Sequence, residues 1–184
     1  MEIGMKKSNR SRQAGATLLE ALAFLGIAAI VAVGAISMFR AAQTTAQAND
    51  VIAQINGMRS TIETLYQTQA SFIGLSSADI IASKAVPANL RVSAGQIFNG
   101  FGGTISFTGL PDTYRIGYTK VPVDVCIKVI ARTLKNWRDI TINPAAGFGS
   151  DVIDAGGTMN MDALSDYCSN SGSSNYADLE WIAR

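Results

Sequence analysis

Hydrophobic and polar residues divide the chain into three stretches. From Ala16 to Met38 it reads ATLLEALAFLGIAAIVAVGAISM, which is apolar over 23 residues except for Glu20. As a helix, this run is long enough to span a bilayer core of about 30 Å. The chain then becomes amphipathic with a spacing of three and four residues, which predicts that the same helix continues. Its apolar stripe holds Ala41, Thr44, Ala48, Val51, Ile55, Met58, Ile62 and Leu65, opposite Gln43, Gln47, Asn49, Gln54, Arg59, Glu63 and Gln67.

These patterns predict a membrane half of the helix over residues 16–40, an amphipathic half over 41–70 and a globular head over 71–184. In the head, a short helix is expected from Ser76 or Ser77 to Lys84, before Pro87. Strands are expected at 96–99, 104–108, 114–119, 137–142 and 178–182. A second helix is expected after Pro122, although its β-branched residues also allow a strand. The fold class is therefore α+β, with an antiparallel sheet packed on the long helix.

Charge placement indicates how the apolar run is oriented. Lys6, Lys7, Arg10 and Arg12 precede it, and only Arg40 follows closely. The positive-inside rule therefore keeps the N-terminus cytoplasmic and exports the remainder. An ordinary secretory signal peptide would have a shorter apolar region. A simple membrane anchor explains everything except Glu20, because a carboxylate in such a run is costly and marks a function.

Composition argues against several function classes. The formal net charge is +1, which does not suit a nucleic-acid binder that relies on neutralising phosphates. The chain has no histidine and two cysteines, so histidine-based catalysis and a four-ligand zinc site are excluded. Asp151, Asp154, Asp162 and Asp166 lack the spacing of a calcium loop, and a solvated loop is expected there. We expect no enzymatic activity, cofactor or metal.

The residues around the start of the apolar run resemble the type IV prepilin signature. Gly15 follows a short basic leader, and Glu20 stands at the fifth position after it. The resemblance implies that a prepilin peptidase removes residues 1–15 and N-methylates Ala16. It also implies that Glu20 of one subunit pairs with the freed amine of a neighbour. Ala16 departs from the family, because type IVa pilins begin with Phe and many type IVb pilins with Met or Leu.

Cys126 and Cys168 both follow the predicted span, and an even number of cysteines in an oxidising compartment favours a disulfide. Type IV pilins carry a similar bridge around a variable, surface-exposed loop, which here would hold residues 136–167. For the aromatic residues Trp137, Tyr176 and Trp181, packing on the sheet is expected rather than an adhesive role.

The resemblance implies a major pilin that polymerises with itself into an extracellular type IVb pilus of a Gram-negative bacterium. Its partners would be the prepilin peptidase, the inner membrane and its pilus assembly machinery, and then a host or recipient cell surface. Such pili serve adhesion, aggregation, motility or conjugative cell contact. The alternatives are a minor pilin or type II secretion pseudopilin, and a membrane-anchored periplasmic domain that does not polymerise. Gly26 and Gly34 would permit either close helix packing or local unwinding in the filament.

Overall fold

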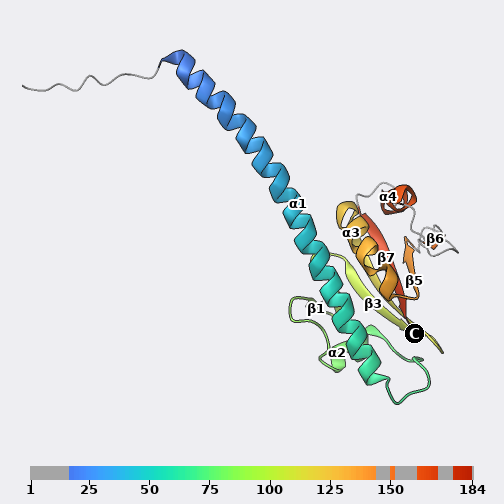
Figure 1. Ribbon diagram of the computed structural model, residues 1–184. Helices are drawn as coiled ribbons and strands as arrows, with labels where there is room; N and C mark the ends of the chain where they lie inside the picture. The colour runs from blue at the N-terminus through green and yellow to red at the C-terminus, as the bar shows by residue number, and fades with distance from the viewer. Residues whose placement is uncertain (1–16, 144–149, 152–160, 170–175, 184) are drawn as a thin grey trace, which may run out of the picture. The chain divides into compact units, whose positions relative to one another are not determined.

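The computed structural model describes residues 17–143, 150–151, 161–169 and 176–183. The chain divides into two compact units, of which the first ends at Ala41 and the second runs from Ala42 to Arg184. Figure 1 gives the order of the elements along the chain. They are α1 (Leu18–Leu65), α2 (Ser77–Ala82), β1 (Arg91–Ser93), β2 (Gln96–Phe98), β3 (Thr104–Gly109), β4 (Tyr114–Pro122), α3 (Val123–Thr133), the 3-10 helix η1 (Leu134–Asn136), β5 (Asp139–Ile142), β6 (Ser150–Asp151), α4 (Met161–Ser169) and β7 (Tyr176–Ala183).

The second half of α1 supplies one wall of the core of the second unit. The stripe predicted from the sequence is confirmed from Ala48 to Ile62: Ala48, Val51, Ile55, Met58 and Ile62 are each at most 2% exposed. Burying five apolar side chains on one helix face contributes several kcal/mol, which compensates for the ordering of the helix. The stripe ends at Leu65, which is 41% exposed and is the last residue of α1.

One polar position on this helix differs from expectation. Gln54 was placed on the solvent side of α1, yet it is only 9% exposed. Its Oε1 accepts a hydrogen bond from the Tyr118 hydroxyl at 3.3 Å, so the buried amide has a partner. The prediction was wrong because a strand far away in sequence supplies a donor at the edge of the apolar stripe, and a buried polar group is tolerated when it is paired.

The sheet has seven antiparallel strands in the order β1-β2-β3-β4-β7-β5-β6. The C-terminal strand β7 therefore lies between β4 and β5, and Figure 1 shows it beside β5. Its side chains alternate in burial, with Ala177, Leu179, Trp181 and Ala183 facing the core. This alternation is the period of a strand with one buried face. Antiparallel pairing confirms the α+β fold predicted from the sequence.

The expected strands are found at β2, β3, β4, β5 and β7, with ends shifted by a few residues. The segment after Pro122 is helical, which settles the helix-or-strand alternative in favour of α3. Val125, Cys126, Val129 and Ile130 are buried at helical spacing, whereas a strand would bury alternate residues. The β1 and β6 strands were not predicted.

Three further expectations need correction. Beyond the strand predicted at 137–142, the region 136–167 was expected to be a loop, but it contains β6 and most of α4, so Asp162 and Asp166 lie on a helix. Tyr176 was expected to pack on the sheet, yet it is 45% exposed at the start of β7, whereas Trp137 and Trp181 are buried as predicted. The helix α2 ends at Ala82, and Lys84 adopts a left-handed conformation with φ 55°.

Gly109 shows why a glycine is needed at the end of β3. A Cβ at this position would lie 1.7 Å from the carbonyl oxygen of Phe72. The chain between α1 and α2 runs alongside the end of β3 here, and the Gly109 N–H donates to the Leu75 carbonyl at 3.1 Å. The absence of a side chain thus permits the close approach that covers this end of the core.

Candidate functional site

The first candidate site is the N-terminal half of α1, which begins with a capped turn. The Thr17 side chain accepts a hydrogen bond from the Glu20 N–H at 3.3 Å, and the Thr17 carbonyl accepts one from Ala21 N–H at 3.1 Å. Thr17 is therefore the residue that caps the helix, and Glu20 occupies its first turn. A carboxylate in the first turn is favoured by the positive end of the helix dipole.

Past Glu20 this half of α1 carries a large exposed apolar surface. Its mean hydropathy reaches 2.5 over an 18-residue window of which none is buried. The helix is long and apolar enough to cross a membrane by length and composition. An apolar surface of this extent on a protein marks contact with lipid or with other chains. In the first half of α1, the large hydrophobic side chains that are at least 55% exposed are Leu18, Leu19, Leu22, Phe24, Leu25, Ile27, Ile30, Val31, Val33, Ile36, Met38 and Phe39.

Of the residues predicted to act here, Glu20 is described, whereas Gly15 and Ala16 lie outside the described residues. The leader 1–15 lies outside them as well. Gly26 and Gly34 are both helical within α1, and a Cβ added at either position would have no neighbouring atom within 4 Å. Both positions thus leave open space on the helix surface of the isolated chain.

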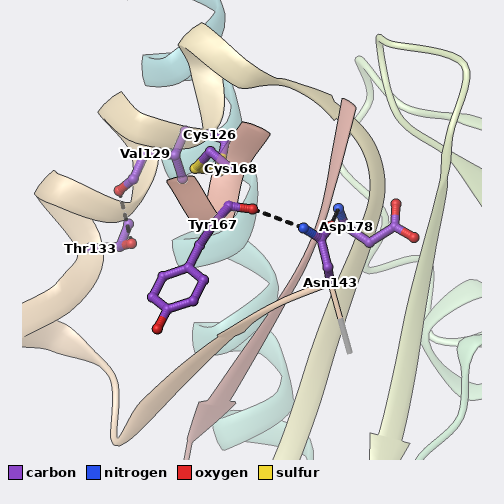
Figure 2. Close-up of a disulfide and its surroundings, with 7 residues drawn as sticks. All are labelled: Cys126, Val129, Thr133, Asn143, Tyr167, Cys168 and Asp178. Atoms are coloured by element: carbon purple, nitrogen blue, oxygen red, sulfur yellow. Dashed lines mark hydrogen bonds between the residues drawn. A yellow bond between two sulfur atoms is a disulfide. The ribbon is translucent and has the colours of Figure 1, made fainter. Parts of the chain in front are cut away.

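The second candidate site is the disulfide between Cys126 of α3 and Cys168 of α4. The two sulfur atoms are bonded, the Cα atoms are 6.1 Å apart, and neither cysteine is exposed. Figure 2 shows the bond between the two helices, where it attaches α4 to α3. The pairing expected from the sequence is therefore present, across a separation of 42 residues. A loop of this size contributes roughly 4 kcal/mol in the chain-entropy account.

Asn143, just after β5, provides a second attachment for α4 and was missed by the sequence analysis. Its side chain donates to the Tyr167 carbonyl at 2.9 Å and accepts from the Asp178 N–H at 2.8 Å (Figure 2). Its backbone is left-handed with φ 54°, and it is only 6% exposed. Asparagine tolerates this conformation better than most residues. The signal in the sequence is an asparagine that follows a predicted strand and precedes Pro144.

A buried hydrogen bond joins α3 to the centre of the sheet. The Thr133 hydroxyl donates to the Val129 carbonyl at 2.9 Å and accepts from the Trp181 indole N–H at 3.2 Å. Trp181 also packs edge-on against the Tyr118 ring, with centroids 5.6 Å apart. These contacts fix the disulfide-bearing helix on β7, so α3 is a rigid base for α4.

Within the described residues, no group of three or more His, Cys, Asp or Glu side chains is placed to hold a metal ion. Burial raises the pKa of Tyr118 and Tyr114 well above 10.0, so both hydroxyls stay protonated. Each belongs to the core, where the Tyr118 hydroxyl donates a hydrogen bond to Gln54.

Comparison with known proteins identifies a matching family and similar proteins. The PilS N-terminal family matches residues 42–178. The chain is similar to the major structural subunit of bundle-forming pilus from Escherichia coli O127:H6 (strain E2348/69 / EPEC), with 25% identity over 134 residues that cover 70% of this chain and 69% of the relative. The protein of the same name from Escherichia coli O111:H- matches to the same extent.

A solved structure supports the fold. The crystal structure of type IV b pilin from Salmonella typhi aligns with a TM-score of 0.54 at 14% identity, covering 71% of this chain and 95% of that chain. A likeness at this identity concerns the fold, whereas the family match extends over more than half of the residues. The chain therefore belongs to the PilS N-terminal family, and its fold is that of a type IV pilin.

Proposed function

We propose that this protein is the major structural subunit of a type IVb pilus, which polymerises through the first half of α1. The observation that carries the proposal is an apolar helix with 12 large hydrophobic side chains exposed and an acidic residue in its first turn. Such a surface needs a lipid or a protein environment. A membrane before assembly and a bundle of identical helices afterwards would each supply one. The relatives named as major structural subunits of a pilus support the same role.

Processing follows from the same proposal. A prepilin peptidase would cleave after Gly15 on the cytoplasmic face and methylate the new amine of Ala16. The whole apolar half of α1 then remains in the product, which an assembly machinery in the inner membrane would extract. The mature subunit would be part of an extracellular filament of a Gram-negative bacterium.

Glu20 would set the register between subunits. Two unit charges about 4 Å apart attract by roughly 4 kcal/mol at an effective dielectric near 20. Removing both from water offsets most of that gain, so the pair adds little net stability. A buried charge without a partner costs free energy. Subunits docked at the wrong height would leave such a charge. The pair of Glu20 with the Ala16 amine of a neighbour therefore selects one arrangement.

The N-terminus of the exported protein provides the direct test. Mass spectrometry of sheared surface filaments is expected to find a chain that begins at methylated Ala16. Recovery of the chain with residues 1–15 still attached would remove the basis for the pilin proposal and favour a membrane-anchored periplasmic domain. A minor pilin or a type II secretion pseudopilin would instead be a small fraction of the filament protein.

A matched set of variants tests Glu20. Glu20→Ala and Glu20→Gln are both expected to abolish surface filaments while the precursor still accumulates in the membrane. The control Asp112→Ala removes an exposed carboxylate from the head, and its filament yield should equal that of the wild type. Normal filaments from Glu20→Gln would show that the charge is not needed for assembly. Whether the filament serves adhesion, aggregation or conjugative contact is tested separately by cell-binding and mating assays.

A further inference from the structure

A cleft lies on one flank of α1 within the second unit. It has a volume of about 240 Å³ and is lined by Gln47, Asp50 and Gln54 of α1 and by Asn89 and Phe101 from the segments around β1 and β2. A water molecule occupies about 30 Å³ in the liquid, so the cleft has room for the end of one long side chain.

The chemistry of the lining suits a basic side chain. Asp50 is exposed, and within the described residues its carboxylate has no hydrogen bond or ion pair. Phe101 is half-buried and offers a ring against which an alkyl stem or a cation packs. The amide oxygens of Gln47 and Asn89 add hydrogen-bond acceptors. A carboxylate, an aromatic ring and amide oxygens together recognise an ammonium or guanidinium group.

The wall that carries Phe101 is held rigidly by Asn99. The Asn99 side chain accepts from the Phe101 N–H at 3.0 Å and from the Gly103 N–H at 2.9 Å, and it donates to the Thr119 carbonyl at 2.8 Å. On the opposite wall, the Tyr118 hydroxyl fixes Gln54. A cleft with fixed walls loses less entropy when it binds a side chain than a mobile one does.

The opposite flank of α1 carries a row of cations. Lys128 of α3 donates to the Thr45 hydroxyl at 3.1 Å, and Arg132 donates to the Asn49 side chain. Lys135 of η1 continues the row; it is exposed, and its ammonium contacts no polar group of the described residues. With 3.6 residues per turn, Thr45 and Asn49 point away from the side of α1 that holds Asp50. The acidic cleft and the basic row therefore face opposite directions.

We propose that the cleft receives Lys135 of a second copy of this chain, so that each head joins the next through its two opposite flanks. The inference rests on the proposed function, since it assumes that copies assemble. A contact between two different patches of one subunit is heterologous, and when its rotation does not close into a ring it generates an open helical polymer. Charge complementarity favours this occupant: the cleft presents a carboxylate, and the opposite flank presents Arg132 and Lys135.

Charge reversal in full-length protein in its own host tests the contact. Asp50→Lys and Lys135→Glu are each expected to lower the yield of sheared filaments by at least about tenfold, because like charges would meet at every repeat. The double variant Asp50→Lys/Lys135→Glu restores the pair in reverse and is expected to return the yield to within about threefold of the wild type. Asp112→Lys places the same charge change on an exposed turn of the head and should assemble normally.

Membrane levels of each variant and formation of its Cys126–Cys168 disulfide show whether the head has folded. For variants that fold, unchanged filament yield after either reversal, or no recovery in the double variant, overturns the inference. A second measurement does not depend on yield: filaments of Asp50→Cys/Lys135→Cys should give a ladder of multimers on non-reducing gels, whereas each single variant should not. If the wild type forms filaments but the double cysteine variant gives no such ladder, that result also counts against the contact. Failure of the wild type to form filaments would instead refute the proposed function.

Discussion

Two tyrosine hydroxyls lie in the apolar core of the head, at Tyr114 and Tyr118. Both residues are fully buried, and desolvation is the largest cause of the rise in each pKa above 10.0. At Tyr114 the neighbouring Glu63 raises the pKa further, while Arg59 opposes it. The neutral hydroxyl is thus the form compatible with the folded head. The stability of the head should therefore depend on pH in the alkaline range.

The direction of this dependence follows from proton linkage. A tyrosine whose pKa is raised on folding contributes its full stability below pH 10, the value in the unfolded chain, and loses it as the pH rises further. The free energy of unfolding should thus be flat up to about pH 10 and then fall by up to about 1.4 kcal/mol per pH unit for each such tyrosine. Denaturant unfolding of the full-length protein in mild detergent, repeated across this range, measures the slope.

Tyr118→Phe is the matched variant for this prediction. It removes one ionisable hydroxyl. The slope of the unfolding free energy above pH 10 should therefore lose the share of Tyr118 and keep that of Tyr114. At neutral pH the variant should lose about 1 kcal/mol, because Gln54 keeps a buried acceptor without its donor. An alkaline slope equal to that of the wild type would contradict the assignment of the dependence to Tyr118.

Among the elements, α4 is held to the head by contacts of two different kinds. The disulfide ties Cys168 to α3, while the Asn143 side chain ties the Tyr167 carbonyl to the start of β7 through Asp178. The two attachments involve adjacent residues of α4 and reach different elements. Leu164, one turn earlier, adds a fully buried side chain. A helix of nine residues has little stability alone, so these tertiary contacts maintain it.

Replacing Asn143 tests the attachment that does not involve the disulfide. Asn143→Ala should lower the free energy of unfolding by about 2–4 kcal/mol, because two backbone groups lose their partner and alanine is strained at positive φ. Asn143→Gly loses the same hydrogen bonds without the strain, so its loss should be smaller by about 1 kcal/mol. Fluorescence of the buried Trp137 and Trp181 reports the unfolding. A loss below about 0.5 kcal/mol for Asn143→Ala would mean that α4 does not depend on this residue.

The contrast between α1 and α4 shows what the sequence was able to predict. The stripe from Ala48 to Ile62 repeats over four turns, so its period identifies both the helix and its buried face. In α4 only Leu164 and Cys168 are buried, which is too short a pattern to distinguish a helix from a loop. The position of Gln54 was not predictable for another reason, since its partner Tyr118 comes from a strand 64 residues away.

The candidate sites also differ in how far the sequence predicts them. Glu20 stood out because a charged residue interrupts an apolar run, which is visible in the sequence itself. The two cysteines stood out by number and by compartment. The cleft at Asp50 gave no such signal, and Asn143 gave only its place between a predicted strand and Pro144, because each is assembled from segments that only the folded sheet brings together.

At the scale of the whole molecule, the two units require different environments. Each buried hydrophobic residue of the described chain lies between Ala48 and Ala183, inside the second unit. The first unit contributes exposed apolar side chains up to Phe39 and no residue to that core. The stability of the head therefore should not require the membrane half of α1, whereas polymerisation through that half should.

A chain consisting of residues 42–184, exported to an oxidising compartment, tests this separation of roles. It keeps the apolar stripe of α1, all seven strands and both cysteines, so it should be soluble, form the Cys126–Cys168 disulfide and unfold in one cooperative step. The midpoint temperature of its thermal unfolding should match that of the head in the full-length protein within a few degrees, because no core side chain has been removed. It should not form filaments at any concentration at which the mature full-length protein does. Insolubility, or loss of cooperative unfolding, would show that residues before Ala42 are part of the folding unit and that the head depends on the membrane half.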